Sequence, residues 1–245
     1  MGEEAIEIPT ADGTADGYLY TPGQDGTAPG VVLLTDIGGI RDPYRELATR
    51  LAEQGYVVLL PNVFYRTAKP PLFDIAPNFS DERTRQRFME LTAPFKPDAV
   101  ERDGKAYLDY LGTRSEVRPG GAGVVGYCFT GSHALRIAAS EPERIKAAAS
   151  YHGGGLFTDR PSSPHLVLPG VKARLYFGHA IEDRSMSDEA IAGLDKALSA
   201  WGGDYESEVY EGAYHGWTMP GRAYNPEQAE RAHTKLIELF DRTLK

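Results

Sequence analysis

Short apolar segments alternate along the chain with longer segments of helical character, and this alternation limits the possible folds more than any other feature. Strands that alternate with helices form a mostly parallel sheet with helices on both faces. We therefore predict an α/β fold. The predicted strands are residues 31–34, 56–60, 122–127, 145–151, 173–177 and 205–210, and the predicted helices are residues 42–54, 98–111, 129–140, 188–201 and 226–244.

Two further regions complete the predicted organisation. Segments 5–8 and 17–20, joined through Asp12-Gly13, are typical of an antiparallel hairpin at the sheet edge. The connection 62–97 is long, rich in proline and aromatic residues, and contains a predicted helix at 80–91. A connection of this length in a compact domain is often a lid or a substrate-binding loop, although a surface excursion fits equally well. No linker divides the chain, so we expect residues 1–245 to form a single domain.

Composition and charge exclude several classes of protein. The chain has 245 residues, of which 41% are hydrophobic and 25% charged, as in globular proteins. A net charge of −9 argues against nucleic acid and anionic membranes as partners. The single cysteine excludes an internal disulfide, and the acidic first ten residues do not resemble a signal peptide. We expect a cytoplasmic protein that is a monomer or a weak homodimer.

A cysteine lies at the junction between a predicted strand and a predicted helix. In the segment 126–131, Cys128 directly follows the apolar strand and precedes the helix. A sharp strand–turn–helix junction lifts the central side chain above the sheet, and the helix N-terminus favours a thiolate. The backbone N–H of Phe129 is then placed to stabilise an oxyanion. Cys128 is therefore a candidate nucleophile, although an inert buried cysteine is the alternative interpretation.

Two later loops supply the acid and the base that a nucleophilic cysteine requires. Each loop follows a predicted strand; the first contains Glu182 and Asp183, and the second contains His215. An α/β-hydrolase presents its nucleophile, acid and histidine in this chain order. We expect His215 to accept the Cys128 proton while one of the two acids orients the imidazole ring. The spacing alone does not separate Glu182 from Asp183.

The sequence resembles the dienelactone hydrolase family, also called carboxymethylenebutenolidases, from about residue 16 to residue 244. The resemblance depends on GYVVLLPN at 55–62, GYC at 126–128, DRSM at 183–186 and YEGAYHG at 210–216. It implies the α/β-hydrolase fold and a cofactor-free hydrolase of small cyclic esters that acts through an acyl-thioester intermediate.

The resemblance also implies roles for individual residues. Cys128 would attack the ester carbonyl, His215 would be the base, and Asp183 rather than Glu182 would hold the imidazole ring. Asp36 falls where the family has a glutamate in contact with the nucleophile, so it is a candidate partner of the resting thiol. The N–H of Ile37 would then be the second oxyanion donor. Asp36 is one methylene shorter than glutamate, and a plain polar loop residue is the alternative.

Several positions depart from the family pattern. Thr130 replaces the usual glycine two positions after the nucleophile. Of the arginines that bind the substrate carboxylate in the family, Arg85 matches one position, whereas Met219 occupies the other and Arg222 lies nearby. An arginine fork is the natural partner of a carboxylate, so its partial loss puts the dienelactone substrate in doubt. The solvated face of a helix is the alternative for Arg85.

Other residues are candidates for the substrate pocket. His152 and Trp217 are candidate substrate-binding residues, although a structural role is the favoured alternative for His152. The spacing of the histidines gives no metal-binding motif. The competing functions are a lactone hydrolase, a broad-specificity short-chain esterase or thioesterase, and a hydrolase fold used only for binding. A set of aromatic residues is expected either to shape an apolar pocket or to pack in the core: Tyr18, Tyr20, Phe64, Tyr65, Phe73, Phe79 and Phe88.

Overall fold

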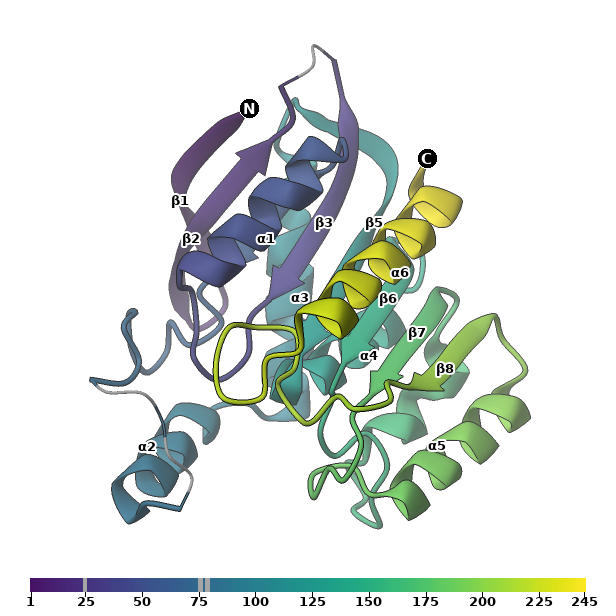
Figure 1. The fold of residues 1–245 in the computed structure, drawn as a ribbon. Coiled ribbons are helices and arrows are strands. Elements are labelled where there is room, and N and C mark those ends of the chain that lie inside the picture. Colours follow the sequence, from purple (N-terminus) through teal and green to yellow (C-terminus); the bar gives the residue numbers. More distant parts are fainter. Residues whose placement is uncertain (24–25, 75–76, 78–79) are drawn as a thin grey trace.

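One eight-stranded sheet forms the centre of the protein. The computed structural model covers residues 1–245 and describes all of them except 24, 25, 75, 76, 78 and 79. The strands follow the order β1-β2-β4-β3-β5-β6-β7-β8 across the sheet, and Figure 1 labels all of them except β4. Their bounds are β1 Gly2–Thr10, β2 Gly13–Thr21, β3 Ala28–Leu34, β4 Val57–Pro61, β5 Val117–Tyr127, β6 Ile145–Tyr151, β7 Arg174–His179 and β8 Tyr205–Val209.

The sheet is parallel except at its N-terminal edge. β3 pairs in parallel with β4 and β5, and β6, β7 and β8 continue this direction. β1 and β2 form an antiparallel hairpin, and β2 is antiparallel to β4. This arrangement confirms the predicted mostly parallel sheet with its N-terminal hairpin. The strand order reverses at β3, and ligands in open α/β sheets bind beyond the carboxyl ends of the strands near such a point.

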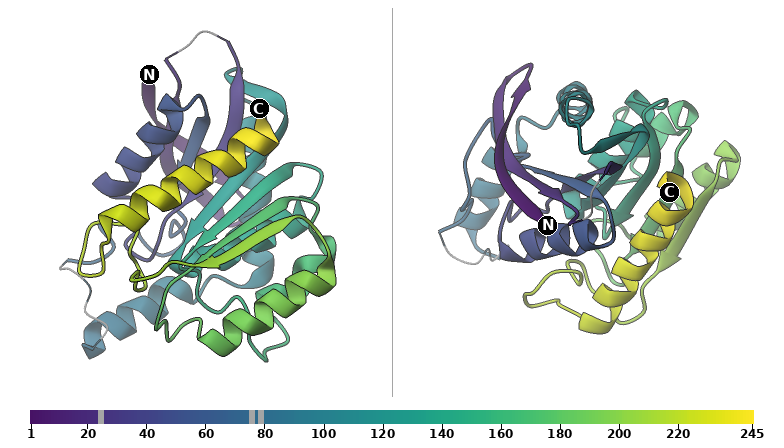
Figure 2. Two further views of the ribbon diagram at one scale, coloured as in Figure 1. Left: turned by 45° about the vertical axis from the view of Figure 1, so that its right-hand side comes forward. Right: turned by 90° about the horizontal axis from the view of Figure 1, so that it is seen from above.

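Helices cover both faces of the sheet, as predicted (Figure 2). Alternate residues of β3 show why: Val31 and Leu33 pack into the core under one pair of helices, whereas Val32 and Leu34 pack into the core on the other face. Side chains of a strand point alternately to the two faces, so a strand that is apolar throughout requires two cores. α1 (Asp42–Glu53) and α6 (Pro226–Leu244) cover one face, and α3 (Pro97–Gly112), α4 (Gly131–Ser140) and α5 (Asp188–Trp201) cover the other.

β5 and one short 3₁₀ segment are among the elements that differ from the sequence-based prediction. β5 begins at Val117, five residues before the predicted start, because Val117 pairs with Ala28 ahead of a register shift. A short 3₁₀ segment, η2 (Pro164–Gly170), was not predicted. The helices α5 and α6 have the predicted bounds.

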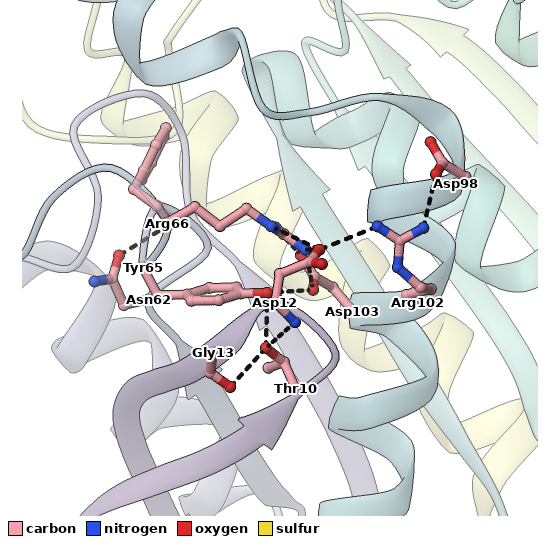
Figure 3. A network of polar contacts seen from close by, with 10 residues as sticks. Thr10, Asp12, Gly13, Asn62, Tyr65, Arg66, Asp98, Arg102 and Asp103 are labelled. Carbon is pink, nitrogen blue, oxygen red and sulfur yellow. Dashed lines mark hydrogen bonds and ion pairs between the residues drawn. The ribbon is translucent and has the colours of Figure 1, made fainter.

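The long connection after β4 contains one helix and is fixed to the rest of the fold by polar contacts. α2 (Glu82–Thr92) lies apart from the other helices, beyond the ends toward which the parallel strands point (Figure 1). Arg66, near the start of the connection, forms ion pairs with Asp103 of α3 at 2.7 Å and with Asp12 of the β1–β2 turn at 2.7 Å (Figure 3). Tyr65 donates to the same Asp103 carboxylate at 2.9 Å.

No helix among the described residues combines the length and the apolar character that crossing a lipid bilayer requires.

We expect Arg66→Met to lower the free energy of unfolding by about 3–5 kcal/mol, because it leaves a buried carboxylate without its cation. The side chains of Arg66 and Asp103 are only 12% and 6% exposed. Urea denaturation of the variant and the wild type measures the difference. The control is Arg102→Met, which removes an ion pair of the same network from a side chain that is 44% exposed. Equal losses in the two variants would contradict the structural role of Arg66.

Candidate active site

Cys128 lies at a sharp turn between β5 and α4. One 3₁₀ turn, η1 (Cys128–Thr130), separates the strand from the helix, and Cys128 adopts a left-handed backbone with φ of 60°. Non-glycine residues rarely adopt this conformation, and it often marks a functional site. Gly126 permits the turn, because a Cβ atom there would lie 2.1 Å from the carbonyl oxygen of Thr130. The sulfur atom is thereby presented at the carboxyl end of the sheet, half-buried.

Thr130 contributes a hydrogen-bonding group at a position where the family pattern has glycine. Its buried hydroxyl accepts a hydrogen bond from the N–H of Tyr127 at 2.9 Å. The same hydroxyl lies 2.9 Å from the carbonyl oxygen of Tyr127, 3.0 Å from that of Thr35 and 3.3 Å from that of Leu34, and these three oxygens are the acceptors for its one proton. Thr130 therefore links the turn that carries Cys128 to the loop after β3, which contains Ile37.

The structure brings Cys128, His215 and Asp183 into one hydrogen-bonded row. The Nε2 atom of His215 lies 3.1 Å from the sulfur of Cys128, and its Nδ1 atom lies 2.7 Å from Oδ2 of Asp183. The other oxygen of Asp183 accepts hydrogen bonds from the N–H and the hydroxyl of Ser185, at 2.8 and 2.7 Å. Asp183 is buried, whereas Glu182 is exposed, so it is Asp183 that holds the imidazole ring.

Electrostatics favour a protonated His215. Burial alone would lower the pKa of His215, but its hydrogen bonds with Asp183 and Cys128 raise that pKa to about 10. For Asp183, burial opposes ionisation, and the contacts with His215 and Ser185 outweigh it and lower the pKa of the carboxyl group. At neutral pH the row therefore contains an imidazolium ion that donates to the carboxylate on one side and to the sulfur on the other.

His152 contacts both the turn that carries Cys128 and the loop that carries His215. The N–H of Cys128 donates to Nδ1 of His152 at 3.1 Å, and Nε2 of His152 lies 2.8 Å from the hydroxyl of Thr218. Burial holds the pKa of His152 well below its usual value, and the nearby charge of His215 lowers it further. Because Nδ1 accepts, the single proton of the neutral ring is on Nε2, which donates to Thr218. His152 thus joins the cysteine turn to the loop that carries His215.

Asp36 forms an ion pair with Arg41, which was not predicted from the sequence. Both of its carboxylate oxygens accept from the guanidinium group of Arg41, at 2.6 and 2.7 Å, and one also accepts from the N–H of Gly38. The predicted contact with the resting thiol stays a prediction, because the carboxylate of Asp36 is directed at Arg41 and at the N–H of Gly38. Ile37 is buried next to this ion pair.

A pocket of about 960 Å³ opens beside the sulfur atom. Nine of the residues that line it were singled out from the sequence: Asp36, Ile37, Phe88, Cys128, Phe129, His152, Glu182, Asp183 and His215. Phe64 is buried behind the pocket wall, and Phe79 lies outside the described residues. The other lining residues were not predicted from the sequence to lie at the pocket: Thr92, Phe95, Ser132, His133, Gly154, Arg184, Ser185, Tyr214 and Gly216.

Three candidate substrate-binding residues lie elsewhere. Arg85 is exposed on α2, where it contacts Glu82 and the carbonyl oxygen of Ser80. Arg222 is exposed on the loop before α6. Trp217 is fully buried and stacks on Tyr210 with ring centroids 4.9 Å apart. None of the three is among the described residues that line the pocket, so their proposed contact with substrate stays a prediction.

The described part of the chain contains no group of three or more His, Cys, Asp or Glu side chains that could hold a metal ion.

The high pKa of His215 is directly testable. We expect the imidazole NMR signals of His215 to titrate near pH 10 in the wild type. In Asp183→Asn the midpoint falls, because the carboxylate that stabilises the imidazolium is lost. The matched control is Glu182→Gln, which removes the neighbouring exposed carboxylate and should shift the midpoint less. An equal shift in both variants would contradict the assignment of Asp183.

Comparison of the sequence with known proteins identifies the family of this chain. The family model for the dienelactone hydrolase family matches residues 15–244. A carboxymethylenebutenolidase from Rhodococcus opacus is 28% identical over 231 residues, which cover 93% of this chain and 86% of that protein. The protein usf of Aquifex pyrophilus is 24% identical and covers 91% of each chain.

Solved structures show the same fold. A dienelactone hydrolase from Anabaena variabilis superposes with a TM-score of 0.71 at 20% identity and covers 100% of this chain and 99% of that one. A dienelactone hydrolase-like promiscuous phosphotriesterase from metagenomic libraries has a TM-score of 0.78 at 22% identity, and each chain is covered completely. Together with the match to the family model over nearly the whole length, these similarities show that the chain belongs to the dienelactone hydrolase family, within the α/β-hydrolase fold.

Proposed function

We propose that this protein hydrolyses small carboxylic esters, including lactones, with Cys128 as nucleophile, His215 as general acid and base, and Asp183 as the group that orients the imidazole ring. The observation that carries the proposal is the continuous row of contacts from the sulfur to Nε2 at 3.1 Å and from Nδ1 to the carboxylate at 2.7 Å. A nucleophile, a base and an orienting acid within hydrogen-bond distance are what nucleophilic acyl transfer requires.

In the first half of the proposed reaction the sulfur of Cys128 attacks the ester carbonyl carbon as a thiolate. The carbonyl π electrons move to oxygen and form a tetrahedral oxyanion. When the oxyanion collapses, the bond to the alkoxide breaks, and the imidazolium of His215 protonates that leaving oxygen. The products of this half are an alcohol and an acyl thioester on Cys128; a lactone keeps both parts in one molecule, bound as the acyl group.

The second half uses His215 in its neutral form as a base. It removes a proton from a water molecule as the water oxygen attacks the thioester carbonyl. Collapse of the second tetrahedral oxyanion breaks the carbon–sulfur bond and releases the carboxylic acid. Cys128 leaves as a thiolate next to the newly formed imidazolium, so the starting charges are restored. The sum is one ester and one water converted to one acid and one alcohol.

The oxyanion in both halves is proposed to be stabilised by the N–H groups of Phe129 and Ile37. Phe129 lies in the first turn after the strand, where N–H groups lack partners within the helix. Ile37 follows directly after Asp36, whose ion pair with Arg41 fixes this loop near the sulfur. Two preorganised N–H donors favour the charge that develops on the carbonyl oxygen.

We also propose that the connection 62–97 forms part of the substrate-binding site. Phe88, Thr92 and Phe95 belong to this connection, and all three line the pocket beside Cys128. This favours the interpretation of the connection as a binding loop over that of a surface excursion. Whether a lactone or an open-chain ester is preferred is measured by comparing kcat/KM for an enol-lactone with that for short-chain esters.

Substitution of Cys128 and of His215 tests the mechanism. Cys128→Ala is expected to abolish turnover of a short-chain ester, because no other group forms the thioester. His215→Gln is expected to reduce kcat/KM on the order of 10²–10⁴-fold, since a general acid and base is lost. Steady-state rates give both values, and mass spectrometry of the quenched wild type should show the acyl group on Cys128.

The matched control is His165→Gln, which changes a half-buried histidine outside the pocket and is expected to retain wild-type kcat/KM. Turnover by Cys128→Ala at the wild-type rate would refute the proposed nucleophile.

A further inference from the structure

Three aromatic side chains form a continuous wall on one side of the pocket. The rings of Phe95 and Phe129 lie 5.4 Å apart at 69°, and each contacts the imidazole ring of His133, at 5.0 and 5.1 Å. The buried ring of Phe64 packs behind both phenylalanines, at 5.5 and 5.4 Å. Phe129 and His133 are four residues apart and therefore share one side of the helical turn. The wall is thus held from three parts of the chain.

The wall carries no charge at neutral pH. His133 is buried, and burial together with the charge of Arg136 lowers its pKa to about 3. Its neighbours on the pocket side are the two phenylalanine rings. The imidazole ring is therefore neutral and acts in the wall as an aromatic surface, stacked on Phe95 at an interplanar angle of 29°.

The charged residues of the pocket do not offer a site for a substrate carboxylate at this wall. Asp36 is paired with Arg41, and Asp183 with His215. Among the described residues that line the pocket, Arg184 is the one arginine or lysine, and it is exposed next to the acidic Glu182. A carboxylate against the aromatic wall would lose water without gaining a cation, which is strongly unfavourable.

The proposed reaction decides which part of the substrate meets the wall. His215 must reach the leaving oxygen, so the alcohol part lies toward the loop that carries His215 and Tyr214. The wall belongs instead to the turn after Cys128, to α4 and to the connection that contains Phe95. The acyl substituent on the attacked carbonyl carbon therefore extends toward the aromatic wall.

We infer that Phe95, Phe129 and His133 form a subsite for an uncharged aromatic acyl group, so that the preferred substrates are neutral aryl or arylalkyl carboxylic esters. This inference rests on the proposed ester hydrolysis. A planar ring packs against this aromatic surface over a larger area than a short alkyl chain does. Contacts between the rings add to the free energy gained from burial of apolar area. The pocket volume of about 960 Å³ leaves room for a ring and an alcohol part together.

The test is a series of vinyl esters that differ only in the acyl group: vinyl acetate, vinyl phenylacetate and monovinyl succinate. The vinyl leaving group contains no ring that would compete for the wall, and proton release follows each reaction. For the wild type we expect kcat/KM to be about tenfold or more higher for phenylacetate than for acetate, with succinate lowest. This comparison needs no variant.

Phe95→Leu supplies the residue-level test, because it keeps the site apolar but removes the ring. We expect the phenylacetate-to-acetate ratio of kcat/KM to fall about tenfold. The matched control is Phe157→Leu: Phe157 also stacks on a histidine, His165, at an interplanar angle of 29°, but lies outside the pocket. This control is expected to leave the ratio unchanged.

Equal kcat/KM values for vinyl acetate and vinyl phenylacetate in the wild type would overturn the subsite, as would succinate being the best substrate. An equal loss of the ratio in Phe95→Leu and Phe157→Leu would also overturn it. These outcomes differ from failure of the proposed function, in which none of the three esters is hydrolysed in a manner that depends on Cys128. Hydrolysis of vinyl acetate that requires Cys128, without any preference for the ring, would leave the proposed chemistry standing and remove only the subsite.

Discussion

The hydrogen bond from the N–H of Cys128 to His152 holds together a site that four different strands supply. Cys128 follows β5, His152 follows β6, Asp183 follows β7 and His215 follows β8, and these strands are neighbours in the sheet. Parallel strands bring these carboxyl ends to one edge, but they fix side chains only to within the freedom of the loops. His152 removes much of that freedom, because its other nitrogen contacts the loop of His215 through Thr218.

Backbone contacts around His152 extend the same constraint to the acid. The N–H of Gly154 donates to the carbonyl oxygen of Cys128 at 3.3 Å, and the N–H of Gly155 donates to that of Ser185 at 2.7 Å. Ser185 in turn donates to the carboxylate of Asp183. The loop after β6 therefore contacts the loops of the nucleophile, the acid and the histidine, although it supplies none of the three proposed catalytic groups. A preorganised arrangement of this kind lowers the cost of aligning the groups in the transition state.

Strand periodicity made most of the fold and the positions of Cys128 and His215 predictable from the sequence, whereas the choice of Asp183 over Glu182 depended on the family resemblance. The reason is physical, since parallel strands bring their carboxyl ends to one edge of the sheet, and the loops that begin there lie close together. Asp36 also follows such a strand, but its partner Arg41 lies five residues further on, in the turn before α1. Its side chain is directed by a local ion pair that strand periodicity does not predict.

Residues on the long connection and on helix faces were less predictable for a related reason. Arg85 lies on an exposed face of α2 and contacts Glu82, one turn away, which a helical charge pattern would also predict. Phe95 and His133 reach the pocket from segments that the sheet does not place directly, so their contact emerges only from the packed structure.

The residues proposed to catalyse the reaction and those proposed to bind the acyl group are therefore held in place by different parts of the fold. The proposed catalytic row lies in the segments that follow β5, β7 and β8, whereas the aromatic wall depends partly on a connection that Arg66 fastens to the hairpin and to α3 (Figure 3). Phe95 lies between that anchor and the start of α3, and its ring contacts those of Phe64 and Phe129. Changes within the connection can therefore reshape the acyl subsite while the distance from sulfur to imidazole stays the same. Substrate preference can therefore change without any change in the proposed chemistry, because a surface connection tolerates substitutions that the packed core does not.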